Sequence, residues 1–405
     1  MPHSSRSRLA HHWLLDPRIH YLNHGSFGAT PGAVLERQRQ IQDELEHHPV
    51  RFLERDLEGH IDEVRSVVAP FLGAQPTDLA FVTNVTSGTN AVLKSLRFQP
   101  GDELLTTDHI YNASRNIMEQ VAAQWGARVV LAEIPFPLED ENTAMNAILS
   151  RAGPRTRLAL IDHVTSPTAL VLPIEKLVPE LESAGVACLV DGAHGPGMLP
   201  LHLDAVGASY YTGNFHKWVS APKASGFLHV RRDRQDEIHP VNTSHGANSL
   251  RSDRSQFLLE FDWEGTEDPS ALLSVPRALE FLGSLHPEGW DGVMGHNRRL
   301  ARRGRDFLCR TFDIEPPCPD SMLGSMAAFP LRELPGGTPT GQELLPDPLQ
   351  LALREDCSIE IPVFHQAANG RRLIRLSAHL YNHESEMVRL ADALNELRTL
   401  AQPDL

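Results

Sequence analysis

The sequence has few cysteines, no long apolar run and no excess of basic residues. Its four cysteines follow no metal-binding or disulfide spacing, which excludes a cysteine zinc site and a disulfide framework. No stretch approaches the ~20 apolar residues of a membrane span, and the polar first residues predict no signal peptide. We therefore expect a cytoplasmic protein with reduced, structural thiols at Cys188, Cys309, Cys318 and Cys357.

Acidic residues outnumber basic residues by 52 to 37, which gives a net charge of −15. Nucleic acids and anionic membranes attract positive surfaces, so we expect neither as a partner. Two histidine pairs, at 11–12 and 47–48, lack the spacing of a metal site, and no metal is expected. The 405 residues suffice for two domains, and 41% hydrophobic residues is typical of a soluble globular enzyme.

Short apolar runs alternate with segments of helical period between about residues 79 and 232. This alternation predicts an α/β fold with a largely parallel sheet covered on both faces. After about residue 270, longer helical patterns at 270–285, 295–310 and 384–400 indicate a smaller α+β domain. The expected strands are 79–83, 103–107, 129–134, 158–164, 187–190 and 227–230, and the expected helices between them include 113–125 and 174–183.

The residues that follow these strands are the candidates for a site, because ligands of such sheets bind at the carboxyl ends of strands. Residues 84–90 follow the first strand and open a helix with small hydroxyl residues and a glycine. Such a helix start offers free N–H groups and a positive dipole end to a phosphate. The alternative is an ordinary helix cap.

Asp191 directly follows an apolar strand, with His194 three residues later. A buried carboxylate requires a partner, and the protonated pyridine nitrogen of pyridoxal phosphate (PLP) is one. The alternative is a helix cap followed by a turn histidine. Lys217 then lies between apolar neighbours, where burial lowers an amine's pKa and prepares it for Schiff-base formation. Lys223, in a Gly/Pro turn, is the competing lysine.

These segments, taken in order, resemble the class V aminotransferase family of fold-type I PLP enzymes, in its isopenicillin N epimerase-like branch, which is related to cysteine desulfurases. The resemblance covers roughly residues 18–398, and the ordered set carries it rather than one motif. It implies a seven-stranded, mostly parallel sheet in a large domain at 20–268 and a small domain formed by 1–19 and 269–405. The matching segments are YLNHGSFG (21–28), TDHIY (107–111), DHVTSPTAL (162–170), VDGAH (190–194), NFHKW (214–218), FDWEGTEDPS (261–270) and RLSAHLYN (375–382).

The resemblance also implies roles for single residues. Lys217 would carry PLP and shuttle the substrate α-proton, and Asp191 would pair with the pyridine nitrogen. Arg375 would bind the substrate carboxylate with help from Asn23 and His24. Arg51 and Arg372 are the alternative arginines for this role. His109, or alternatively Tyr111, would stack on the ring. Ser166 and His194 would lie near the ring hydroxyl, and the phosphate would be held by Val85, Thr86, Asn214, His216 and, from the neighbouring subunit of a homodimer, Thr266.

One departure bears on the reaction. Cysteine desulfurases carry a nucleophilic cysteine shortly before the carboxylate-binding arginine, and residues 364–367 here are Phe-His-Gln-Ala. Cys357, at the start of an expected strand at 358–363, is interpreted as structural. We therefore expect an enzyme that removes the α-proton of an amino acid through an external aldimine, followed by epimerisation or C–S β-elimination. Aminotransferase or desulfurase activity, and a PLP-binding regulatory protein without turnover, are the alternatives.

Overall fold

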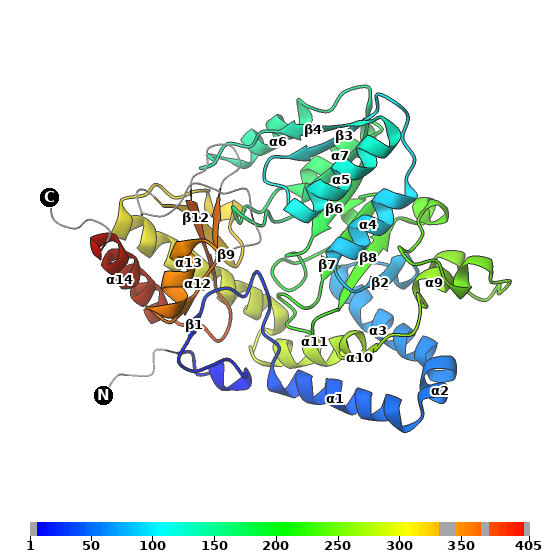
Figure 1. Cartoon of the computed structure of the whole chain (residues 1–405), viewed down its shortest axis with the longest axis horizontal. Coiled ribbons are helices and arrows are strands. Elements are labelled where there is room, and N and C mark those ends of the chain that lie inside the picture. The colour runs from blue at the N-terminus through cyan, green and yellow to red at the C-terminus, as the bar shows by residue number, and fades with distance from the viewer. Residues whose placement is uncertain (1–5, 332–345, 366–371, 401–405) are drawn as a thin grey trace.

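The computed structural model describes residues 6–331, 346–365 and 372–400. In Figure 1 a large part built around a central sheet lies beside a smaller part that contains the C-terminal helices. Among the helices of the described residues, none has both the length and the apolar composition needed to cross a bilayer.

The central sheet has seven strands in the order β2-β8-β7-β6-β5-β3-β4. Only β8 runs antiparallel to its neighbours, so the expected mostly parallel, seven-stranded α/β sheet is confirmed. The strands are β2 (Leu79–Val82), β3 (Glu103–Thr107), β4 (Arg128–Ala132), β5 (Thr156–Asp162), β6 (Ala187–Gly192), β7 (Tyr210–Asn214) and β8 (Gly226–Val230).

The six apolar runs predict every strand of this sheet except β7. The last two residues of β7, Gly213 and Asn214, are of types that are depleted in strands. Gly213 is nevertheless required there, because a Cβ on it would lie 2.5 Å from the Phe227 ring on β8. Close packing between β7 and β8 therefore explains why a glycine stands here, although glycine makes the strand harder to predict from the sequence.

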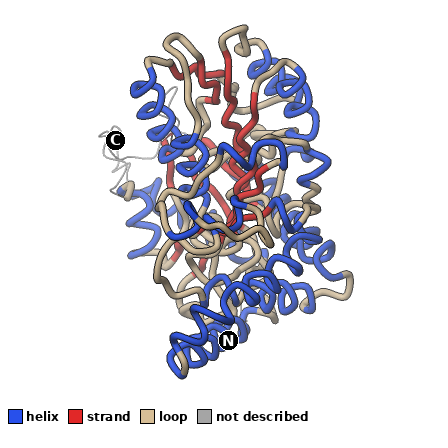
Figure 2. The backbone as a smooth tube through the Cα atoms, turned by 90° about the vertical axis from the view of Figure 1, so that its right-hand side faces the viewer, coloured by secondary structure: helices blue, strands red, loops and turns tan. Residues whose placement is uncertain are grey.

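Alternate residues of the strands enter two separate apolar cores. On β5, Leu158 and Leu160 pack with residues of α4 and α5, while Ala159 and Ile161 belong to the core that includes α7. Figure 2 shows the strands running between helices on either side. Burial on both faces is what a parallel sheet requires, and it leaves the strand ends as the place for polar chemistry.

Two of the expected helices, 174–183 and 384–400, have the bounds that the sequence predicts. The expected helix 270–285 is instead divided into α10 and α11 next to Pro276, which lacks the N–H that a continuous helix needs. The helices are α1 (Gly32–His47), α2 (Pro49–Arg51), α3 (Leu57–Leu72), α4 (Val85–Ser95), α5 (Asn112–Trp125), α6 (Glu141–Leu149), α7 (Ile174–Ser183), α8 (Leu203–Val206), α9 (Gln256–Phe261), α10 (Ser270–Leu273), α11 (Val275–Ser284), α12 (Gly289–Phe312), α13 (Pro348–Glu355) and α14 (Glu384–Leu400).

The smaller part contains an antiparallel sheet in the order β11-β12-β9, formed by β11 (Val363–His365), β12 (Arg372–Ser377) and β9 (Met326–Pro330). The strand expected at 358–363 is interrupted at Pro362, which separates β11 from β10 (Ile359–Glu360). β10 pairs in parallel with β1 (His20–Tyr21), so the start of the chain is joined to its C-terminal part. The domain bounds stay a prediction.

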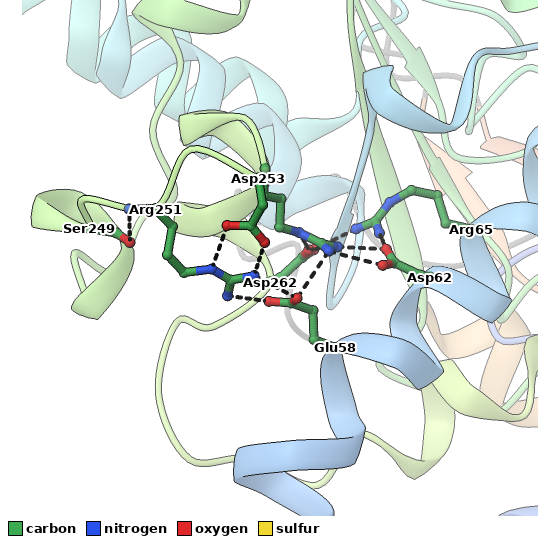
Figure 3. A network of polar contacts seen from close by, with 8 residues as sticks. Glu58, Asp62, Arg65, Ser249, Arg251, Asp253 and Asp262 are labelled. Carbon is green, nitrogen blue, oxygen red and sulfur yellow. Dashed lines mark hydrogen bonds and ion pairs between the residues drawn. The ribbon is translucent and has the colours of Figure 1, made fainter.

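Ion pairs connect α3 to the segment between residues 249 and 262 (Figure 3). Arg65 donates to Asp62 and, at 2.6 Å, to Asp262. Arg254 also bonds both of these carboxylates, with 2.7 Å between its Nη2 and Oδ2 of Asp262. We call this set, together with Glu58, Arg251 and Asp253 at its outer end, the ion-pair network. It fixes the chain just before residues 263–269.

Candidate active site

The carboxyl ends of β5, β6 and β7 bring polar side chains together at one edge of the central sheet. Asp162 ends β5 and lies opposite Asp191 near the end of β6, and Asn214 ends β7. Lys217 follows in the turn between β7 and β8. The candidate residues thus come from neighbouring strand ends, where ligands of parallel sheets bind.

Lys217 has the properties of a reactive amine. Burial, and next the positive charge of Arg375, lower its pKa to about 8, against opposing effects of Asp191 and Asp162. Its Nζ lies 3.3 Å from Nε2 of His194. Lys223, the competing lysine, donates instead to the carbonyl oxygen of Gly28 at 2.6 Å. The structure therefore favours Lys217 as the amine that is free to react.

His194 is held in one tautomer by its neighbour Trp218. The indole N–H of Trp218 donates to Nδ1 of His194 at 3.2 Å. Burial holds the pKa of His194 well below its ordinary value, so the ring is neutral. Because Nδ1 accepts, the single ring hydrogen is on Nε2 and points toward Lys217 Nζ. This contact stabilises the neutral amine of Lys217.

Asp191 is a buried carboxylate with few protein partners. Its Oδ2 accepts from the Ser114 hydroxyl and its Oδ1 from the Ala193 backbone N–H, both at 3.1 Å. Burial raises the pKa of Asp191 and raises that of Asp162 well above its ordinary value, the latter also through the charge of Asp191. A cationic nitrogen next to Asp191 would relieve this like-charge pair, which fits a pyridinium ring.

The N-terminus of α4 offers donors for an anion. Val85 N–H is already taken by the Asn214 side chain at 3.0 Å, and Ser87 N–H by Asn84, also at 3.0 Å. Val85 and Asn214 are therefore together as expected, but that N–H is not available to a phosphate. Among the described residues of this first turn, Thr86 is exposed and keeps both its N–H and its hydroxyl without a protein acceptor. Thr86 fits a phosphate best.

His216 and Thr266 are the other residues expected at the phosphate. Nδ1 of His216 contacts the carbonyl oxygen of Ser225 at 3.2 Å, and burial lowers the His216 pKa to about 4. Its Nε2 therefore lacks a hydrogen until a nearby anion raises the pKa. Thr266 lines a cavity of about 400 Å³ together with Thr86 of the same chain. A role for Thr266 across subunits stays a prediction.

Arg375 is a buried guanidinium that has no carboxylate partner within the part of the chain that the structure describes. It donates to the carbonyl oxygen of Ser166 at 2.7 Å, to the Ser166 hydroxyl at 3.2 Å and to the Ser26 hydroxyl at 2.8 Å. Its Nε has no partner, and burial lowers its pKa to about 9. Arg51 instead bonds Asp56, and Arg372 bonds Asp347. Arg375 is therefore the arginine suited to bind a substrate carboxylate.

The N-terminal loop at 22–30 contacts both Lys217, through its backbone, and Arg375, through its side chain. His24 Nε2 lies 2.9 Å from the carbonyl oxygen of Lys217. A Cβ on Gly28 would lie 2.4 Å from the His216 carbonyl oxygen, so only glycine allows this approach. Asn23 is buried, and its side-chain oxygen has no hydrogen-bond partner. The loop thus places His24 next to Lys217, and a role of Asn23 and His24 in substrate binding stays a prediction.

His109 and Tyr111 approach the site differently. Both ring nitrogens of His109 are engaged, by the Thr168 hydroxyl at 2.9 Å and the Ile134 carbonyl oxygen at 3.0 Å, so only its ring face is free. Tyr111 is 48% exposed. Its electrostatic interaction with Arg375 raises the pKa of the arginine and so partly offsets the lowering by burial. Stacking by either residue stays a prediction.

The cysteines are all free and buried. Burial raises the pKa of Cys357, which makes its thiol a poor nucleophile. Of the segment where desulfurases carry their cysteine, Gln366 and Ala367 lie outside the described residues. Among the described residues, no cysteine is exposed for sulfur transfer.

Sequence reasoning missed three residues that position the site. Ser26 bonds Arg375, Ser114 bonds Asp191 and Trp218 bonds His194. Ser26 and Trp218 lie inside the segments that carry the family resemblance. That position was the only feature of the sequence that could have pointed to a role for them at the site. Ser114, in the first turn of α5, gives no sequence signal of a partner on β6.

Comparisons with known proteins identify the family of the chain. The profile of the family described as Aminotransferase class-V matches residues 21–390. The chain is 36% identical over 397 residues to isopenicillin N epimerase of Amycolatopsis lactamdurans, which covers 95% of this chain and 96% of the relative. It is 31% identical over 416 residues to a probable chloroplastic L-cysteine desulfhydrase of Arabidopsis thaliana, which covers 96% and 85%.

Solved structures show the same fold. The cystine C–S lyase C-DES, in complex with its product cysteine persulfide, superposes with a TM-score of 0.76 at 22% identity over 92% of this chain and 96% of the lyase. The cysteine desulfurase CsdA of Escherichia coli gives 0.77 at 20% identity over 98% of both chains. A mutant of C-DES carries glycine covalently linked to its PLP cofactor. Given the match over nearly its whole length, the chain belongs to the class V aminotransferase family, whose members are fold-type I enzymes that use pyridoxal 5′-phosphate.

Proposed function

We propose that this chain removes the α-proton of an amino acid and that Lys217 accepts it. The observation that carries the proposal is the buried pair of Lys217 and Arg375, which lie close enough for the arginine to lower the pKa of the lysine. Among the described residues neither basic side chain has a carboxylate within ion-pair distance, so a ligand that brings negative charge would stabilise both. An amino-acid carboxylate and a cofactor phosphate both supply it.

The residues present fit PLP. Lys217 would hold it covalently, Asp191 would face its ring nitrogen, and Thr86, with His216 and Thr266, would bind its phosphate. Ser166 and His194 would lie near the ring hydroxyl. When bound, PLP supplies an electron sink for the carbanion left by proton removal.

Substrate binding exchanges hydrogen bonds at Arg375. Its two terminal nitrogens now donate to Ser166 and Ser26, and a carboxylate can replace these neutral acceptors with two charge-assisted bonds. Bidentate binding fixes the orientation of the α-carbon relative to Lys217. The unpartnered side-chain oxygen of Asn23 can accept from a substrate donor.

Lys217 takes the proton as its neutral amine. A pKa of about 8 leaves a useful fraction neutral near physiological pH, unlike an ordinary lysine with a pKa of 10.5. The Nε2–H of His194 donates to the amine and holds it in place. Trp218 acts through His194 and is a positioning residue.

Two outcomes follow proton removal. Return of a proton to the opposite face gives epimerisation, the reaction in the names of the relatives from Amycolatopsis lactamdurans and Streptomyces clavuligerus. Loss of a β-thiol gives C–S elimination, the type of reaction in the desulfhydrase names. The buried cysteines of the described residues favour direct elimination over persulfide transfer. We propose epimerisation as the first candidate and C–S elimination as the second.

The test is to incubate the PLP-loaded protein with a panel of amino acids and small peptides in D2O. NMR would report exchange of the α-hydrogen, and product assays would report D-isomers, pyruvate, ammonia and sulfide. We expect exchange with at least one substrate, accompanied by inversion or elimination. Ligand-induced spectral change without any α-exchange would contradict the proposal and support a binding protein without turnover.

We also propose a homodimer in which Thr266 completes the partner's site. Light scattering on the holoenzyme would measure the mass, and Thr266→Ala would be expected to weaken PLP retention without changing that mass. A monomer that retains PLP fully would contradict the dimer.

A further inference from the structure

A second group of ligating side chains lies away from the active site. Asp78 belongs to a 3-10 turn (Pro76–Asp78), Asp204 to α8, and His229 to β8. Among the described residues these three form a group whose ligand atoms all lie within 4.8 Å of one another. His229 pairs with Leu79, the first residue of β2. The group therefore lies at the opposite ends of the strands from Asp191 and Asn214.

His229 is the unusual member. Its side chain is 4% exposed, and neither ring nitrogen makes a hydrogen bond. Its Nε2 lies 3.5 Å from Oδ1 of Asp204, at the outer limit for hydrogen bonding. The imidazole nitrogen is also a common ligand of transition-metal ions. A buried imidazole with two unpartnered nitrogens is costly unless something binds it.

Both carboxylates are oriented by glutamine amides. Gln235 donates to Oδ1 of Asp78 at 2.9 Å, and Gln75 donates to Oδ2 of Asp204 at 3.1 Å. Each acid therefore has one oxygen held by an amide and the other left for a ligand. Such outer hydrogen bonds are what orient the ligands of metal sites in proteins.

The separation of His229 and Asp204 suits a small divalent ion. Zinc binds nitrogen and carboxylate oxygen at about 2.0–2.2 Å, which in a tetrahedron separates neighbouring ligand atoms by about 3.4 Å. The contact between His229 and Asp204 is already 3.5 Å. An imidazole among the ligands favours zinc, cobalt or nickel over magnesium or calcium, which prefer oxygen alone.

We propose that Asp78, Asp204 and His229 bind one divalent transition-metal ion, with zinc as the best fit, and that the ion joins α8 and the 3-10 turn to β8. Water completes the coordination, because Asp204 is partly exposed. The ion has a structural role, since the group lies at the opposite edge of the sheet from Lys217.

The experiment uses untagged holoenzyme dialysed against a chelator and then against metal-free buffer. Zn2+ would be titrated by calorimetry, and Co2+ by the visible absorption that tetrahedral coordination produces at longer wavelength than the cofactor. We expect one equivalent per chain and a higher unfolding temperature with zinc. Absence of stoichiometric uptake would overturn the proposal.

Two variants test the site itself. Asp204→Asn removes a partly exposed ligand and should weaken zinc binding at least tenfold with the fold intact. Gln75→Ala removes only an orienting amide and should weaken it about 10–100-fold. Unchanged affinity in Asp204→Asn would overturn the proposal.

Matched controls exclude adventitious binding. Asp236→Asn removes an exposed acid from the 3-10 segment Arg232–Glu237, and should leave zinc affinity unchanged. The exposed pair His47 and His48 provides a histidine control, as the double variant His47→Gln/His48→Gln. Loss of the bound equivalent in that double variant, and not in Asp204→Asn, would place the ion at the surface histidines and overturn the proposal.

Discussion

Charged side chains are arranged in opposite ways in the ion-pair network and in the candidate active site. In the network, Arg65 and Arg254 alternate with Asp62 and Asp262, so each buried charge has an opposite neighbour (Figure 3). In the active site, the basic side chains Lys217 and Arg375 influence each other and Asp162 lies beside Asp191, although both aspartates also attract the charge of Lys217.

The difference separates stability from function. Charges that satisfy one another need no ligand and hold the fold together. Like charges placed side by side raise the energy of the ligand-free site, and a cofactor and a substrate with complementary charges lower it again. Four variants test whether the charges of each region behave accordingly, and a fifth tests whether Cys357 takes part in the reaction.

Lys217→Ala should have the largest effect. Loss of the base should lower turnover by about 10²–10⁴-fold and abolish the covalent link to PLP. Borohydride reduction followed by peptide mass spectrometry would locate that link in the wild type at Lys217. Lys223→Ala is the control, and loss of the link in that variant instead would reject the assignment.

Arg65→Met should be the most damaging change in the network. The Arg65 side chain is 3% exposed and that of Asp262 is 8% exposed, so removal of Arg65 leaves the buried Asp262 with one of its two arginine partners, Arg254. Because hydrogen bonds to charged groups contribute about 1.5–3 kcal/mol each, the expected loss of unfolding free energy is of that size, measured by urea denaturation. Arg251→Gln, at the exposed end, is the control and should leave stability unchanged. An equal loss in both variants would contradict the distinction between buried and exposed pairs.

Arg375→Lys should weaken amino-acid binding. Charge-assisted hydrogen bonds contribute about 1.5–3 kcal/mol each, so loss of bidentate geometry predicts at least a tenfold higher Kd. The absorption spectrum of the enzyme with bound PLP should not change, because Arg375 contacts substrate. Titration of the substrate-induced spectral shift measures the Kd, and equal values for both proteins would mean that the carboxylate binds elsewhere.

Trp218→Phe should change pH dependence more than maximal rate. Attachment of PLP to the apoenzyme needs neutral Lys217, so its rate should rise with pH around the lysine pKa of about 8. Without the indole N–H, His194 is no longer fixed as a donor to Lys217, the neutral amine loses support, and the midpoint should move upward. The maximal rate should fall less than tenfold. An unchanged midpoint would make Trp218 merely a packing residue.

Cys357→Ser should have the smallest effect. The thiol is buried and its pKa is raised, so most activity should remain. Complete loss of turnover in a folded variant, judged by circular dichroism, would support the desulfurase alternative.

Periodicity predicted six of the seven strands of the sheet, and the position after each strand predicted where the polar residues gather. The bounds of α7 were predicted because Leu177, Val178 and Leu181 repeat with helical period, whereas β7 was missed because packing against Phe227 outweighs its weak propensity. Lys217 and Asp191 could be singled out because each is an ionisable residue next to apolar residues that are expected to be buried. Ser26 and Ser114 could not, because a serine's partner depends on how distant segments pack.

The loop at 22–30 has a mechanical consequence. β1 anchors one end of it to β10 in the smaller part of the molecule, and Gly28 is in contact with the backbone of His216 and Lys217 at the other end. Any rotation of the smaller part relative to the sheet therefore transmits force along a short length of chain to the backbone of the reactive lysine. A protein that lacks its first 30 residues would lose this coupling, and the position of Lys217 would no longer depend on how the two parts are oriented.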